Sequence, residues 1–109
     1  MQYIPQQDDI IHRLWLKNKY YRFCLYYYSD KTSEIILSDV KVNKIFRRHG
    51  YGNILLKHAK QLARERRFKK LFLNVKCGSW MEQWYKRNGF DFFEYHKERE
   101  GYVWLKCKL

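Results

Sequence analysis

One glycine-containing segment, Arg47-Arg48-His49-Gly50-Tyr51-Gly52, joins a predicted strand to a predicted helix. Upstream, residues 34–42 end in alternating apolar and polar side chains and are rich in β-branched residues, which is typical of a half-buried strand. Downstream, from about residue 51 to 67, apolar side chains recur at helical spacing. The segment therefore predicts a strand, a glycine loop and a helix, in that order.

This loop has the properties of an anion site. A helix that begins at a glycine loop presents unpaired backbone N–H groups and the positive end of its dipole at one point, which suits a diphosphate. Glycine at 50 and 52 keeps side chains away from those amides, and Arg47 and Arg48 add positive charge. We expect His49 and Tyr51 to belong to the same site. A nucleoside triphosphatase loop is disfavoured, because no Lys-Ser or Lys-Thr follows the second glycine.

A second block follows in the chain. Residues 71–75 read as a short apolar strand, which we expect to lie parallel to the strand ending at Val42, because a helix connects them. A helix over 79–87 is predicted to begin at Ser79, with Glu82 completing a capping box. Residues 90–95 and 101–107 then read as a closing hairpin.

Two motifs in these blocks resemble those of the GNAT (Gcn5-related N-acetyltransferase) superfamily. Residues 42–52 are similar to its acetyl-coenzyme A signature, Arg/Gln-x-x-Gly-x-Gly/Ala, and residues 85–90 to its Tyr-x-x-x-Gly-Phe. The resemblance covers roughly residues 34–95. It implies an α/β (α+β) fold: one mixed, mostly antiparallel sheet, flanked by helices, with a central parallel strand pair splayed around the cofactor. We expect one domain over 1–109, with a cofactor-binding core at 34–95 and a shortened acceptor-side segment at 1–19.

The resemblance also implies an activity, the transfer of an acetyl group from acetyl-coenzyme A to an amine. It places the backbone of Val42 and Asn74 against the pantetheine arm, and it brings Ser79 to the cofactor site. It makes Tyr85 the proton donor to the leaving thiolate, since a phenol is protonated at neutral pH; the alternative is that Tyr85 is a core aromatic. Glu34 is the candidate base. Removal of the proton through water, or an amine that arrives neutral, is an equal alternative.

Composition limits the partners. The 109 residues carry 23 Lys and Arg against 11 Asp and Glu, a net charge of +12, which favours anionic partners such as coenzyme A, an acidic protein surface or nucleic acid. The three cysteines are scattered, without metal-ligand spacing, and indicate reduced thiols in a cytoplasmic protein. We expect no metal and no membrane span.

The start of the chain reads as a short helix, from Asp8 and Asp9 through Trp15, that replaces two helices of the resembled fold. Residues 20–28 are aromatic on both faces and predict a strand that hairpins through residues 29–33 into the strand at 34–42. This aromatic run could instead be a base-stacking platform for single-stranded nucleic acid.

The function that fits these features is acetyl transfer to an amine, with a macromolecular acceptor expected because the acceptor wall is short. The acceptor would be a protein lysine or N-terminus, or an aminoacyl group. The alternative is a non-catalytic module that binds coenzyme A or nucleic acid on the same scaffold. The basic cluster at 64–70 would then touch phosphates, or it is simply a solvated helix end. Exposed aromatics are consistent with a homodimer.

Overall fold

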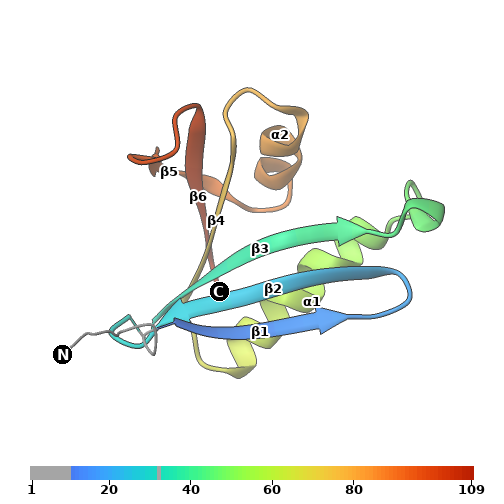
Figure 1. The fold of residues 1–109 in the computed structure, drawn as a ribbon, viewed down its shortest axis with the longest axis horizontal. Coiled ribbons are helices and arrows are strands. Elements are labelled where there is room, and N and C mark those ends of the chain that lie inside the picture. Colours follow the sequence, from blue (N-terminus) through green and yellow to red (C-terminus); the bar gives the residue numbers. More distant parts are fainter. Residues whose placement is uncertain (1–10, 32) are drawn as a thin grey trace.

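A single mixed sheet organises the computed structural model, which describes residues 11–31 and 33–109. Its six strands lie in the order β1-β2-β3-β4-β6-β5 (Figure 1). In chain order the elements are β1 (Ile11–Lys17), β2 (Tyr21–Tyr28), β3 (Glu34–Val42), the 3₁₀ turn η2 (Lys44–Phe46), α1 (Tyr51–Glu65), β4 (Lys70–Lys76), α2 (Trp80–Arg87), β5 (Asp91–Tyr95) and β6 (Tyr102–Lys108).

The sheet is split into two halves at its parallel pair. β3 and β4 are paired only from Glu34 with Lys70 to Ile36 with Phe72, whereas every other neighbouring pair of strands is antiparallel. Figure 1 shows β1, β2 and β3 running together while β4, β6 and β5 turn away from them. The prediction of one mostly antiparallel sheet with a splayed central parallel pair is therefore confirmed.

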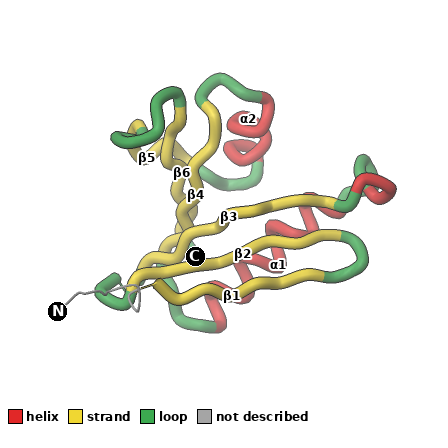
Figure 2. The backbone as a smooth tube through the Cα atoms, viewed as in Figure 1, coloured by secondary structure: helices red, strands yellow, loops and turns green. Residues whose placement is uncertain are grey.

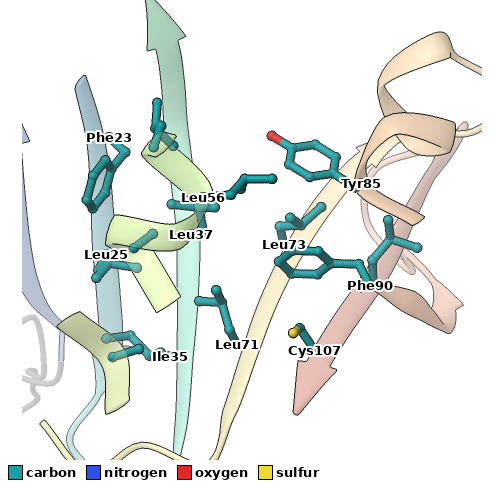
Figure 3. Close-up of a cluster of buried hydrophobic side chains, with 14 of the residues drawn as sticks. Phe23, Leu25, Ile35, Leu37, Leu56, Leu71, Leu73, Tyr85, Phe90 and Cys107 are labelled. Atoms are coloured by element: carbon teal, nitrogen blue, oxygen red, sulfur yellow. The ribbon is translucent and has the colours of Figure 1, made fainter. Parts of the chain in front are cut away.

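The hydrophobic core lies between the sheet and its two helices. α1 crosses behind β2 and β3, and α2 lies beside β4 (Figure 2). Leu55, Leu56, Ala59 and Ala63 form the buried stripe of α1, at the helical spacing that the sequence predicts. They join Phe23, Leu37, Leu73 and Tyr85 in one cluster (Figure 3). Both helices therefore cover the same face of the sheet.

The other face of the sheet, here called the open face, carries Tyr26, Ile36 and Phe72, which are aligned across β2, β3 and β4. Neither of the two described helices packs on it. Phe72, which is nearly buried, packs edge-on against Phe93, with 5.2 Å between ring centroids. The open face is thus an aromatic surface without a helical cover in the described part of the chain.

The predicted N-terminal helix is wrong over residues 11–15. They lie in strand β1, which pairs with β2 along its whole length, from Ile11 opposite Tyr28 to Lys17 opposite Arg22. The spacing of Ile11, Leu14 and Trp15 suits a helix, but Leu14 and Leu16 pack on the core while Trp15 is 59% exposed, which is the period of a strand. Pairing also satisfies the backbone of β2, whose edge would otherwise be bare. Asp8, Asp9 and Ile10 lie outside the described residues.

The remaining element predictions are confirmed to within two residues at the ends. The aromatic run forms β2, and its inward residues Tyr21 and Phe23 are packed beneath α1, where the Tyr21 hydroxyl lies 2.8 Å from His58 Nδ1. The N-cap is confirmed at Ser79, whose Oγ accepts a hydrogen bond from the Glu82 amide at 3.3 Å. The capping box is only half formed, because the Glu82 carboxylate accepts from the Gly78 amide and the Ser79 amide donates to the Lys76 carbonyl. No helix in the described residues is long and apolar enough to cross a membrane.

Candidate active site

The N-terminus of α1 is left open to an anion. Its N-cap is Gly50, in the left-handed conformation with φ 83°; no side chain caps it and the first turn carries no acid. The amide of Ile54 makes the first helical bond, to the Gly50 carbonyl. The amides before it therefore keep their donor capacity, as at any uncapped helix start.

The N-terminus of α2 shows the contrast. It is capped from within the protein, because Ser79 Oγ accepts from the Glu82 amide, and it already carries an acid, the Glu82 carboxylate, which accepts from the Gly78 amide at 2.7 Å. This hydrogen bond, and then the Lys86 ammonium 3.0 Å away, lower the pKa of Glu82. Of the two helix starts, the one at the glycine loop is free to bind a diphosphate.

A cleft of about 820 Å³, here called the loop cleft, lies beside the start of α1. It is lined by residues from the end of β3, the glycine loop and α2: Val40, Lys41, Val42, Arg47, Arg48, Gly50, Tyr51, Gly52, Asn53, Trp80, Met81 and Trp84. Six of the predicted cofactor residues are among them. His49, which is exposed, does not line this cleft.

Glycine is needed at positions 50 and 52 for different structural reasons. Gly50 has open space where a Cβ would stand, so its role is the positive φ of 83°. A Cβ on Gly52 would stand 3.0 Å from Cζ2 of the Trp84 ring, so this glycine lets α1 and α2 approach. Arg47 is held against the end of β3, because its Nε donates to the Val42 carbonyl at 3.0 Å.

A second cleft, the gap cleft, occupies the space where β3 and β4 separate, with a volume of about 430 Å³. Its walls include residues 37–40 of β3 and 73–76 of β4, together with Ser79 and Tyr85. β3 carries a bulge here, since Cys24 pairs with Ser38 but Arg22 with Lys41, and Asp39 takes a positive φ of 54°. The loop and gap clefts share Val40, Trp80 and Met81, so they are continuous.

Tyr85 reaches this cleft from α2. It is 5% exposed, and burial raises the pKa of its phenol to about 12. Its hydroxyl has no hydrogen-bond partner among the described residues. Figure 3 shows its ring extending from α2 with the oxygen at the tip, above Leu73. A buried hydroxyl without a hydrogen-bond partner in the described part of the chain is unusual and indicates a functional role.

At the open-face mouth of the gap, sequence reasoning missed two polar groups. The first is Asp39, whose carboxylate accepts from Ser38 Oγ at 3.0 Å. The second is Arg99, which donates to the Asn74 side chain at 2.9 Å and lies over the Tyr102 ring, 3.6 Å from its centroid. No local pattern marks either residue, because strand separation and a distant loop bring them to the gap.

A third cleft, the open-face cleft, has a volume of about 730 Å³. Five aromatic residues line it: Tyr26, Tyr28, Phe72, Phe93 and Trp104. Its polar lining residues are Lys31, Glu34, Asn74, Glu94, His96, Lys97 and Glu98, with Ile36 between them. Asn74 lines both this cleft and the gap cleft, so the two meet there. Glu34 and Tyr85, the two predicted catalytic residues, therefore lie in different clefts.

These features fit acetyl-coenzyme A. The uncapped glycine loop suits the diphosphate, and the separated strand edges suit the pantetheine arm, whose amides pair as a strand would. The unpartnered Tyr85 hydroxyl suits the sulfur. The described residues hold no cluster of His, Cys, Asp or Glu that could bind a metal ion.

Comparisons with known proteins agree with this geometry. The model of the acetyltransferase (GNAT) family matches residues 10–90. A GNAT family acetyltransferase from Elizabethkingia anophelis, solved with acetyl-CoA bound, has a TM-score of 0.70 and 18% identity, over 95% of this chain and 80% of that chain. The IAA acetyltransferase from Bacillus cereus has a TM-score of 0.69 and 17% identity, over 93% and 79%.

The ribosomal-protein-S18-alanine N-acetyltransferase from Escherichia coli gives a TM-score of 0.67 and 18% identity, over 94% of this chain and 71% of that chain. A comparison with curated proteins gave no match. The structural likenesses, all at low identity, establish the fold. Because the family model takes in both motifs and most of the sheet, the chain belongs to the acetyltransferase (GNAT) family.

Proposed function

We propose that this protein is an N-acetyltransferase that uses acetyl-coenzyme A to modify an amine on a macromolecule: a protein N-terminus, a lysine or an aminoacyl group. The observation that carries the proposal is the open-face cleft, about 730 Å³ in volume and not covered by either described helix. Sites for small molecules normally enclose most of their ligand. A wide cleft along an uncovered sheet face can instead admit a segment of a larger acceptor. The reacting amine of that acceptor would enter at Asn74, and the remainder of the acceptor would lie outside the cleft.

The cosubstrate would be held from the other side of the sheet. We assign its diphosphate to the amides of Gly50, Tyr51 and Gly52, with Arg47 and Arg48 supplying positive charge. His49 would then serve at the rim, since it does not line the loop cleft. Bidentate guanidinium contacts to phosphate are the strongest of these interactions.

The pantetheine arm would lie in the gap cleft. Asn74 lines this cleft, and Val42 lines the loop cleft, which is continuous with it. Ser79 contributes as a wall residue only, because its Oγ already donates to the Lys76 carbonyl at 2.7 Å and caps α2. When bound, acetyl-coenzyme A supplies an activated acetyl group; the protein's part is to position two reactants and to move one proton.

Tyr85 is the proposed donor of that proton. With a pKa raised to about 12 by burial, its Oη holds a proton at every pH at which the protein works. The strand amides at Val40 and Val42 are the donors available to polarise the thioester carbonyl. Asp39 and Arg99 line the same gap and set its electrostatics at the acceptor side.

Glu34 is proposed to meet the acceptor. It lies on the open-face cleft, opposite Lys70 at the paired end of the strands, whereas Asn74 marks the reaction point four residues further along β4. At that separation the proton of the amine reaches Glu34 only through water, or the amine arrives neutral. The three free cysteines fit a reducing compartment, so we propose that the reaction occurs in the cytoplasm.

The test is a panel of acceptors incubated with the protein and acetyl-coenzyme A and read by mass spectrometry. Unstructured peptides with a free N-terminus or a lysine should gain one acetyl group, and Tyr85→Phe should slow this without abolishing cosubstrate binding. Turnover of small amines alone, with no peptide modified, would refute the macromolecular acceptor. Tyr27→Phe is the control, because Tyr27 packs on Phe68 and lines none of the three clefts described above.

A further inference from the structure

The open-face cleft contains more negative charge than its surroundings predict. The chain carries 23 Lys and Arg against 11 Asp and Glu, yet Glu34, Glu94 and Glu98 line this cleft against Lys31 and Lys97. None of the three glutamates forms an ion pair in the described part of the chain, where the recorded salt bridge joins Lys86 to Glu82. Carboxylates left unpaired in a strongly basic protein mark a place for an external cation.

The aromatic walls suit the same ligand. Tyr26 and Tyr28 form one side, with 6.2 Å between ring centroids, and Phe93 and Trp104 the other. Aromatic faces attract ammonium and guanidinium groups, and the phenyl ring of Phe93 already has the Lys106 ammonium 5.3 Å from its centroid. Carboxylates together with aromatic faces bind a cation and repel a nucleic acid.

The loop that supplies Glu98 is held in place. The imidazole of His96 stacks on Trp104, with 5.1 Å between ring centroids, and its Nδ1 accepts from the amides of Glu98 and Arg99 at 3.2 and 3.0 Å. Arg99 in turn holds Asn74. One side of the cleft is therefore anchored before any acceptor arrives, which lowers the entropic cost of binding.

Strand register gives the spacing between this charge and the reaction point. Glu34 lies opposite Lys70, four residues before Asn74, which is about 13 Å at roughly 3.3 Å per residue. Glu94 is aligned with Trp104, and Trp104 with Asn74, so it lies two strands from Asn74, about 10 Å at roughly 4.8 Å per strand. Because β3 and β5 lie on opposite sides of β4, Glu94 is too far from Glu34 to share a cation with it.

We propose that the acceptor is an extended basic peptide: its reacting amine enters at Asn74, and a second cation, on a residue three or four positions away, binds Glu34 on the side of the cleft that Tyr26 and Tyr28 form. This inference rests on the proposed function, because it concerns the same acceptor cleft. It specifies the acceptor further, as a peptide that carries a positive charge at a defined distance from its reacting amine.

The experiment measures peptide binding to the protein saturated with coenzyme A, so that no acetyl transfer takes place. The first probe is an alanine-based peptide with arginine at its fourth position, and the second has citrulline there, which is similar in size and uncharged. We expect the arginine peptide to bind roughly twofold to fivefold more tightly, as one partly exposed ion pair would provide. Equal affinity for the two peptides would overturn the proposal.

Variants locate the effect. Glu34→Gln should remove the preference for arginine, while Glu100→Gln should keep it, because Glu100→Gln makes the same charge change outside the lining of the cleft. Loss of the preference in Glu100→Gln as well would reduce the effect to long-range charge and contradict the proposal. Spermidine binding as tightly as the arginine peptide, and depending on Glu34, would show a polyamine site instead.

These outcomes are separable from those of the proposed function. Acetylation of peptides without any preference for arginine leaves the transferase proposal intact and overturns this one. Tight, Glu34-dependent binding of the arginine peptide without any acetylation would overturn acetyl transfer to peptides and leave the basic-peptide site standing.

Discussion

Gly52 on α1 and Trp84 on α2 approach so closely that a methyl group on Gly52 would lie 3.0 Å from Cζ2 of the indole ring. This contact joins the helix that starts at the glycine loop to the helix that carries Tyr85 across the gap cleft. The separation of the two helices, and with it the width of the channel between the diphosphate site and the reaction point, depends on the lack of a side chain at position 52.

Gly52→Ala should therefore destabilise the protein, although the same change in a free helix stabilises it by about 0.5–1 kcal/mol. Overpacking against Trp84 costs about 1–3 kcal/mol, which exceeds that gain. Urea unfolding should show a net loss of about 1 kcal/mol. In the Trp84→Phe background, where the ring that clashes is gone, the same substitution should become neutral or stabilising. A loss of equal size in both backgrounds would contradict this contact.

Tyr85→Phe should lower kcat and leave stability nearly unchanged. The hydroxyl has no partner among the described residues, so its removal breaks no hydrogen bond in the folded protein. The KM for acetyl-coenzyme A should change little, since the contact concerns the leaving sulfur. Steady-state kinetics and thermal unfolding of the two proteins check this, and a stability loss above about 2 kcal/mol would indicate a structural role for the hydroxyl.

The raised pKa of Tyr85 also predicts how stability falls in alkali. The pKa rises from 10.0 to about 12 on folding, so the folded state favours the protonated phenol. That contribution is complete below pH 10 and is lost as the pH rises through 12, by an amount on the order of 2–3 kcal/mol. Unfolding measured from pH 9 upward should show this slope in the wild type and a smaller one in Tyr85→Phe. Identical slopes would contradict the burial of the hydroxyl.

The lowered pKa of Glu82 predicts that the protein loses stability as the pH falls, the opposite direction to the effect of Tyr85. The Gly78 amide and the Lys86 ammonium lower the pKa of Glu82, so its contribution is present above the pKa of an unfolded glutamate and is lost as the pH falls through the folded value. Glu82→Gln keeps an acceptor for the Gly78 amide but removes the charge. Its stability deficit in urea should be on the order of 1 kcal/mol at neutral pH and should shrink below pH 4.

Much of the fold follows from local sequence signals. The apolar stripe on α1, the N-cap at Ser79 and the alternation in β3 each lie within one element, so residue spacing is enough to predict them. β1 does not follow, because the spacing of Ile11, Leu14 and Trp15 matches a helix and pairing with β2 overrides it. Tertiary pairing outweighs local pattern in such short segments.

The candidate site divides in the same way. Gly50, Gly52 and Tyr85 stand in motifs with fixed spacing; the two glycines line the loop cleft and Tyr85 lines the gap cleft. The bulge at Asp39, the contact between Arg99 and Asn74 and the three unpaired glutamates have no such signature. They arise because the strands separate and because the loop between β5 and β6, which carries Arg99, folds back to a strand far earlier in the chain.

The central claim, that the start of α1 binds the diphosphate of acetyl-coenzyme A, is tested most directly by titrating the ligand against Gly50→Asn and Gly50→Asp. Both residues tolerate a left-handed backbone and they differ only in charge. Calorimetry should give Gly50→Asn an affinity near that of the wild type, and Gly50→Asp an affinity lower by tenfold or more, or about 1.4 kcal/mol. Equal affinities for the two variants would contradict the claim, because a carboxylate at the N-cap would then leave the diphosphate undisturbed.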